Sequence, residues 1–175
     1  TSNISVPVSG AFYTSLNGVN GGSNDNITVS TVVLSVRQVG GNCYTPGVGF
    51  GAACPNWFGA KGTTTAWTYD FEGSPPWVTN TQYVVSSSGT DVANNVQVML
   101  SSSAFTFDSS TPTVVILKPV VGRSKDLATL SGTALDTAPG ALKRVEMRVK
   151  RLTSPVLYVP PPPGGRGSPW PRRSC

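Results

Sequence analysis

A pattern that begins twice is the feature that most constrains how this 175-residue chain can fold. Residues 3–37 contain a short apolar run, a glycine-containing turn, a second run, a polar loop and a long alternating run, and residues 113–150 follow the same order. The positions that correspond are a proline, a glycine, an aspartate and three alternating apolar residues, namely Pro7, Gly21, Asp25, Val32, Leu34 and Val36 in the first segment and Pro119, Gly132, Asp136, Val145, Met147 and Val149 in the second. Their offset of 111 to 113 residues is too long for a solenoid unit and is the size of a small domain. The sequence therefore predicts one whole module and roughly the first half of another.

The composition favours an all-β protein with many turns. Charged residues make up only 12% of the chain, whereas 19 glycines and 15 prolines punctuate it. No window has sustained helical periodicity, and the clearest predicted strand is 66–71, in which Trp67, Tyr69 and Phe71 alternate with polar residues. About seven short strands separated by turn residues predict an antiparallel β-sandwich.

The predicted strands of the first module are 4–8, 16–22, 27–38, 66–71, 82–86, 96–100 and 104–107, with a polar loop at 87–95. Those of the second are 114–117, 128–131 and 145–149. We expect one core between two sheets, formed by Val32, Leu34, Val36, Trp67, Tyr69, Phe71, Val85 and Phe107.

Residues 1–112 resemble the bacterial Ig-like repeat of large secreted or cell-surface proteins. The matching pieces are "NISVPVSGAFY", "VVLSVRQ", "WFGAKGTTTAWTYDF", "QYVVSSSGTDVANNVQ" and "FTFDSSTPTV", and the second module repeats the opening with "TVVILKP", "ATLSGTALD" and "VEMRVKR". The resemblance implies an all-β, Ig-like antiparallel β-sandwich followed by an incomplete second Ig-like module. The expected domains are a complete module at 1–110, half a module at 111–151 and a Pro/Gly/Arg-rich tail at 152–175.

Two cysteines suggest a disulfide and an oxidising compartment. Cys43 and Cys54 flank a Gly- and Pro-rich segment, and a bridge between them would contribute roughly 3 kcal/mol in the chain-entropy model. Two free thiols are the alternative, but two cysteines without histidine cannot fill a tetrahedral zinc site. Cys175 is left over as a free or intermolecular thiol.

Charge and composition argue against several function classes. The net charge of +5 divides into −3 for residues 1–110 and +8 for residues 111–175, but no nucleic-acid motif accompanies the basic half. The chain has no histidine, so a Ser-His-Asp triad cannot form, and it has no apolar run of about 18 residues that would span a membrane. We therefore expect neither an enzyme nor a protein that binds nucleic acid or crosses a membrane.

The sequence suggests two binding sites, one for calcium and one for carbohydrate. The loop aspartates Asp25, Asp91 and Asp108 offer hard oxygen ligands for calcium, although aspartate is also an ordinary turn residue. Four aromatic residues could stack on a carbohydrate, although a small module must also bury its aromatic rings in its core. These residues are Trp57, Trp67, Trp77 and Tyr83.

The expected function is that of a non-catalytic, extracellular spacer from a repeat array of the stalk or adhesin type. Its expected partners are neighbouring Ig-like modules or another copy of the chain. A carbohydrate-binding module is the alternative, and a filament subunit completed by a neighbour's strand is a weaker one. After Arg151 the repeated pattern ends. The sequence that follows is interpreted either as a basic polyproline-type segment or as an out-of-frame translation. The half-module needs a cover for its apolar face, either from module one, from 157–163 folded back or from a second chain.

Overall fold

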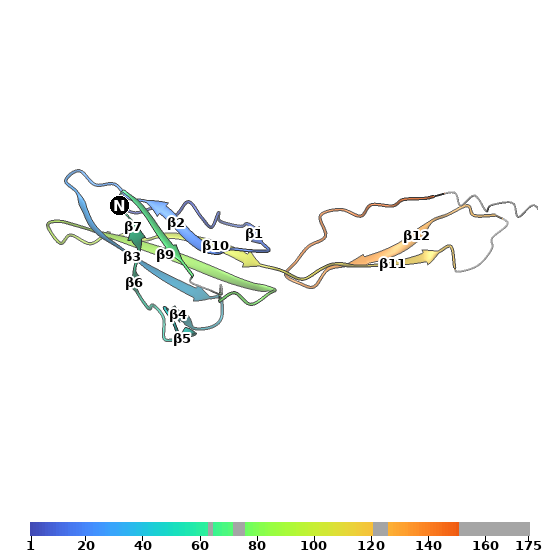
Figure 1. The fold of residues 1–175 in the computed structure, drawn as a ribbon, viewed down its shortest axis with the longest axis horizontal. Helices are drawn as coiled ribbons and strands as arrows, with labels where there is room; N and C mark the ends of the chain where they lie inside the picture. Colours follow the sequence, from blue (N-terminus) through green and yellow to red (C-terminus); the bar gives the residue numbers. More distant parts are fainter. Residues whose placement is uncertain (63–64, 72–75, 121–125, 151–175) are drawn as a thin grey trace, which may run out of the picture. The chain divides into compact units, whose positions relative to one another are not determined.

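The computed structural model describes residues 1–62, 65–71, 76–120 and 126–150. These residues form twelve strands and no helix (Figure 1). The strands make a seven-stranded, a three-stranded and a two-stranded sheet. The first two sheets lie within residues 1–107 and share one buried apolar cluster, so the predicted all-β sandwich is confirmed.

The larger sheet has the strand order β1-β10-β9-β3-β4-β5, with β6 also paired to β3. Its strands are β1 (Phe12–Tyr13), β3 (Val29–Gln38), β4 (Cys43–Thr45), β5 (Gly49–Ala52), β6 (Phe58–Gly59), β9 (Thr81–Asp91) and β10 (Ser101–Phe107). All pairs are antiparallel except β1 with β10, which are parallel. The smaller sheet has the order β2-β8-β7 and consists of β2 (Gly18–Gly22), β7 (Lys61–Gly62) and β8 (Ala66–Asp70).

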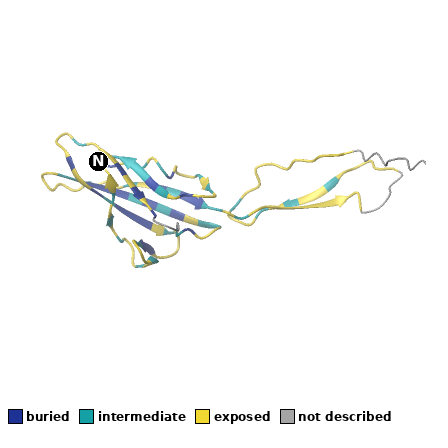
Figure 2. Ribbon diagram, viewed as in Figure 1, coloured by how far each residue is buried: buried dark blue, intermediate teal, exposed yellow. Residues whose placement is uncertain are grey.

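Alternation along the long strands builds the inner face of the larger sheet. Val32, Leu34 and Val36 of β3 are buried, and Val36 lies opposite the buried Val85 of β9. β-branched side chains suit this position because they pack well on a pleated surface. In Figure 2, buried residues follow β3 and β9 along the larger sheet.

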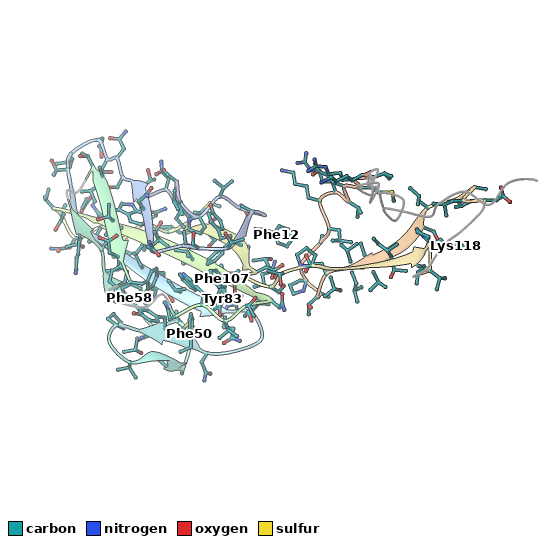
Figure 3. All side chains as sticks on the ribbon, turned by 45° about the vertical axis from the view of Figure 1, so that its right-hand side comes forward. Phe12, Phe50, Phe58, Tyr83, Phe107 and Lys118 are labelled. Carbon is teal, nitrogen blue, oxygen red and sulfur yellow. A yellow bond between two sulfur atoms is a disulfide. The ribbon has the colours of Figure 1, made fainter. Side chains whose placement is uncertain are left out.

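Aromatic rings fill the space between the sheets. Trp77 contacts Phe71, Tyr83 and Phe105 with ring centroids 4.7, 4.9 and 5.2 Å apart. The side chain of Tyr83 lies among these rings on β9 (Figure 3). The predicted core is confirmed for seven of its eight residues, and Phe107 packs against it half-buried while Phe105 takes the buried position on β10.

The predicted strand at 96–100 and the interruption after it are wrong. Residues 96–100 make only an isolated bridge, whereas the serines of 101–103 belong to β10. These serines suit a strand because Ser103 donates a hydrogen bond to the Pro7 carbonyl and Ser102 shares one with Ser86. The predicted loop at 87–95 is wrong in its first half, since β9 runs on to Asp91, and the predicted strand 4–8 makes only a bridge at Val6.

The two-stranded sheet consists of β11 (Thr113–Lys118) and β12 (Ser131–Leu135). β11 confirms the predicted strand at 114–117, while β12 begins three residues later than the predicted start at 128. No strand forms at 145–149, where the apolar side chains are exposed, because a strand needs a paired neighbour and a covered face to persist. Segment 157–163 and the tail at 152–175 lie outside the described residues. The domain boundaries at 110 and 151 stay predictions.

Truncation of Trp67 is expected to destabilise the first sandwich severely. Trp67 is 1% exposed, and Trp67→Ala would leave a cavity that costs about 3–5 kcal/mol of the free energy of unfolding. Urea denaturation followed by circular dichroism measures this cost. The matched control is Trp57→Ala, whose ring is 37% exposed and whose removal should cost far less. Equal losses in the two variants would contradict the assignment of Trp67 to the core.

Candidate functional site

A groove lies beside the disulfide of the first sandwich. It has a volume of about 390 Å³, within the range of small-molecule sites, and we call it the disulfide groove. It is lined by Ser35, Arg37, Cys43, Cys54, Pro55, Trp57, Val84, Ser86, Leu100 and Ser102.

A row of serines forms the floor of the disulfide groove. Ser35, Ser86 and Ser102 lie opposite one another on β3, β9 and β10, on the face of the sheet that points away from the aromatic core. The hydroxyls of Ser86 and Ser102 are 3.0 Å apart and share a hydrogen bond. Ser35 is buried against the sulfur of Cys43, so Ser86 and Ser102 are the serines that offer hydroxyl groups to a polar ligand.

The disulfide holds one wall of the groove. Cys43 and Cys54 are bonded, with Cα atoms 5.2 Å apart, which confirms the predicted pairing. Beside it, the side-chain amide of Asn56 donates to the Tyr44 carbonyl at 2.8 Å and to the Thr45 hydroxyl at 3.0 Å. The bond and the two hydrogen bonds fasten residues 54–56 to β4, so the neighbouring Trp57 is presented at the rim of the groove. A disulfide is also compatible with an oxidising compartment.

The four aromatic residues proposed for carbohydrate binding do not form a platform. Trp67, Trp77 and Tyr83 are 1%, 8% and 0% exposed, so they belong to the core and the prediction of a shared aromatic surface is wrong. Burial is possible because each polar tip finds a partner. The indole N–H of Trp67 donates to the Gly22 carbonyl, that of Trp77 to the Leu16 carbonyl, and the Tyr83 hydroxyl accepts from the Val78 N–H. Burial raises the pKa of the Tyr83 hydroxyl. Trp57 alone of the four is exposed.

The disulfide groove combines an aromatic rim, hydroxyl groups and the exposed guanidinium of Arg37. Its described lining contains no carboxylate, so these residues offer binding contacts but no carboxylate acid or base. The arrangement suits a ligand that has both an apolar face and hydroxyl or acidic groups.

The three aspartates proposed for calcium are not brought together. Asp25 and Asp91 line the same shallow pocket near the amino terminus, but Asp108 follows β10 at the other end of the sheet. Asp91 ends β9 and Asp108 lies beside its start, so the eleven residues of β9 separate them, which is about 33 Å of strand. Within the described part of the chain, no three His, Cys, Asp or Glu side chains form a metal-binding group.

Asp91 and Asp108 are explained by the turns they close. The carboxylate of Asp91 accepts hydrogen bonds from the backbone N–H of Ala93 and of Asn95 at 2.8 Å each, and from the Asn95 side-chain amide at 2.7 Å. These bonds to Asn95, with that from Ala93, lower the pKa of Asp91. Hydrogen bonds from Ser110 likewise lower the pKa of Asp108. Both aspartates thus act as ordinary turn residues.

Sequence reasoning missed Gln97, which ties the amino terminus to the larger sheet. Its carbonyl oxygen accepts from the backbone N–H of Ser2 at 2.6 Å and of Gly89 at 3.1 Å, and its amide donates to the Met99 carbonyl at 2.6 Å. No local signal marks this residue, because the two backbone N–H groups from which it accepts are 95 and 8 positions away in the sequence.

Comparison with known proteins assigns no family to the chain. No family model and no curated protein matches it. A solved structure, "The crystal structure of CopC from Methylosinus trichosporium OB3b", is similar over 62% of this chain and 94% of that chain, with 17% identity and a TM-score of 0.42. A likeness this low assigns neither the fold nor the activity of that protein. No helix with the length and apolarity to cross a bilayer occurs among the residues that the structure describes.

Acid is expected to remove the contribution of Asp91 to stability. Because the pKa of Asp91 is lowered on folding, its charge stabilises the fold above the unfolded pKa of about 3.9, and this contribution is lost as the pH falls through the folded pKa. Asp91→Asn should therefore be less stable than the parent at pH 7, and the difference should shrink below about pH 4. Urea midpoints at pH 7 and at low pH measure it.

Asp25→Asn is the matched control for this charge removal. Its carboxylate accepts one long hydrogen bond, from the Ile27 N–H at 3.3 Å, so the loss at pH 7 should be smaller. A difference for Asp91→Asn that is the same at both pH values would contradict the role given to the charge.

Proposed function

We propose that this chain is an extracellular, non-catalytic structural module from an array of Ig-like repeats, of the stalk or adhesin type. Three of the four aromatic residues considered for binding, Trp67, Trp77 and Tyr83, are committed to the core of the first sandwich. The disulfide supports a location outside the reducing cytosol. The observation that carries the proposal is that two distant parts of the chain pair in the same register.

Strand pairs with a matching register support the proposed repeat. In the first module, the bridged residues are Ser2 with Ser23 and Val6 with Asn20. Adding 112 to the first partner and 111 to the second gives Val114 with Ala134 and Lys118 with Ser131. Both of these pairs occur in β11–β12. The offsets are those of the sequence pattern, so strand pairing and residue pattern support the same repeat.

A glycine in each pairing supports the correspondence at atomic detail. A Cβ atom on Gly21 would overlap the carbonyl oxygen of Asn3, and a Cβ atom on Gly132 would overlap that of Val115. Asn3 and Val115 correspond through the same offset of 112. Each module therefore needs glycine at this position, because a neighbouring backbone approaches too closely for any side chain.

Completing the second module is the direct test of the repeat. Since Arg37 corresponds to Lys150, a chain in which residues 38–112 follow Lys150 should form a second sandwich. We expect a monomer with two disulfides and about twice the near-ultraviolet circular dichroism of the first module, and with the β11 and β12 amides protected from hydrogen exchange. The control carries the same addition after a shuffled 113–135 segment. A second half that stays unprotected in both chains would overturn the repeat.

The disulfide groove supports carbohydrate binding as a second candidate function. The exposed ring of Trp57 lies beside the hydroxyls of Ser86 and Ser102 and the guanidinium of Arg37, a combination that suits the apolar face and hydroxyls of a sugar. Glycan-array screening followed by calorimetry should identify a ligand, and Trp57→Ala should weaken its binding about tenfold, or 1.4 kcal/mol, without changing the melting temperature. Binding that survives Trp57→Ala would place the sugar elsewhere, and an array without hits would leave only the spacer.

A further inference from the structure

The outer edge of β12 lacks a neighbour that its counterpart in the first module has. β2, which corresponds to β12, lies between the amino-terminal segment and β8, with Gly22 opposite Ala66 and Gly18 opposite Asp70. In the described residues, β12 pairs only with β11 (Figure 1). Among the described residues, one backbone edge of β12 is therefore unpaired, whereas β2 is paired along both edges.

We propose that this edge of β12 accepts an extended, antiparallel strand with aromatic side chains at alternate positions. The proposal rests on the proposed repeat and names the chemistry of the strand that would pair with this edge. Strand addition of this kind gains affinity from backbone hydrogen bonds and specificity from alternate side chains.

The first module shows which backbone groups would be used. The N–H of Ser23 donates to the Thr65 carbonyl, next to β8, at 3.2 Å. Ala134 is the residue that corresponds to Ser23, so its N–H is the matching donor. Asn20 bonds in the other direction, to Val6, and its counterpart Ser131 faces Lys118 on β11. The backbone N–H and C=O groups of successive β12 residues thus point alternately toward β11 and toward the opposite edge, as in any antiparallel sheet.

The side chains of the donor follow from the pairing of β8. Trp67 lies opposite Gly21, and its ring occupies the space that a side chain on Gly21 would need. Gly132, which corresponds to Gly21, likewise has no side chain that would block an aromatic ring. Tyr69 lies opposite Val19, whose counterpart is Leu130. An incoming strand therefore needs one aromatic residue over Gly132 and a second, two positions later, over Leu130.

Exposed apolar side chains show why the edge needs a partner. Val114 and Ile116 of β11 are 59% and 71% exposed. Their counterparts in the first module are the buried Ser2 and the half-buried Ile4, which packs against the core. These side chains lie on the faces of the hairpin, and uncovered apolar faces beside an unpaired strand edge favour association. The β8 of a second copy is not the donor, because Trp67 and Tyr69 already fill the core of its own sandwich.

The test uses the full chain and a synthetic peptide with the sequence of residues 65–71, TAWTYDF. Titrated into the ¹⁵N-labelled chain, the peptide should shift the amides of β12 saturably and slow their hydrogen exchange. A control peptide with serine in place of the residues that correspond to Trp67 and Tyr69, TASTSDF, should bind at least tenfold more weakly.

Two variants at one position test the edge itself. Ala134→Pro removes the donor N–H and should abolish binding, whereas Ala134→Ser keeps the N–H, carries the residue found at position 23 and should bind as the parent does. Unchanged β11 amide shifts in Ala134→Pro would show that the hairpin survives.

Three results would overturn the proposal. They are equal binding of both peptides, shifts confined to strands other than β11 and β12, or a dimer by light scattering whose β12 edges are already paired. If the peptide fails while the completed two-module chain folds, the repeat stands and the acceptor edge alone is lost.

Discussion

Aromatic packing between the two sheets is the interaction on which the rest of this structure depends. Trp77 reaches Phe71, Tyr83 and Phe105, and Trp67 closes the same cluster from the smaller sheet. These large rings bury far more apolar area than the valines around them. A module of this size has little other apolar volume, so the two sheets hold together chiefly through these side chains. Their polar tips are satisfied by backbone groups, which is why tryptophan and tyrosine can be buried so fully.

The cost of this core is a shortage of aromatic surface for binding. The rings that could have stacked on a ligand are inside, and Trp57 is held at the surface by the disulfide and Asn56. The aspartates in the loops are similarly engaged, since Asp91 and Asp108 satisfy the backbone of their own turns. The described surface of the first sandwich is thus built mainly for stability, which suits a spacer better than a receptor.

The second hairpin shows how little of a sandwich two strands can make. β11 and β12 reproduce the pairing register of the first module, so local pattern suffices to align two adjacent strands. Val114 and Ile116 of this hairpin are exposed, whereas β2 pairs with β8, a strand more than forty residues later in the chain, and its Val19 is buried. The contrast between this hairpin and the sandwich separates what two adjacent strands encode from what a complete fold supplies.

The sequence by itself determined the all-β class, the inward residues of β3, β8 and β9, and the disulfide, because alternation with period two and cysteine spacing are local properties. Only the tertiary structure decided that Trp77 belongs to the core, that Gln97 anchors the amino terminus, and that Asp25 and Asp91 share an end of the sheet without Asp108. The tertiary structure also decided that the serines of 101–103 belong to β10 and that residues 96–100 form no strand. These outcomes depend on which distant strands become neighbours, and the free energy of that choice lies in long-range contacts that no sequence window contains.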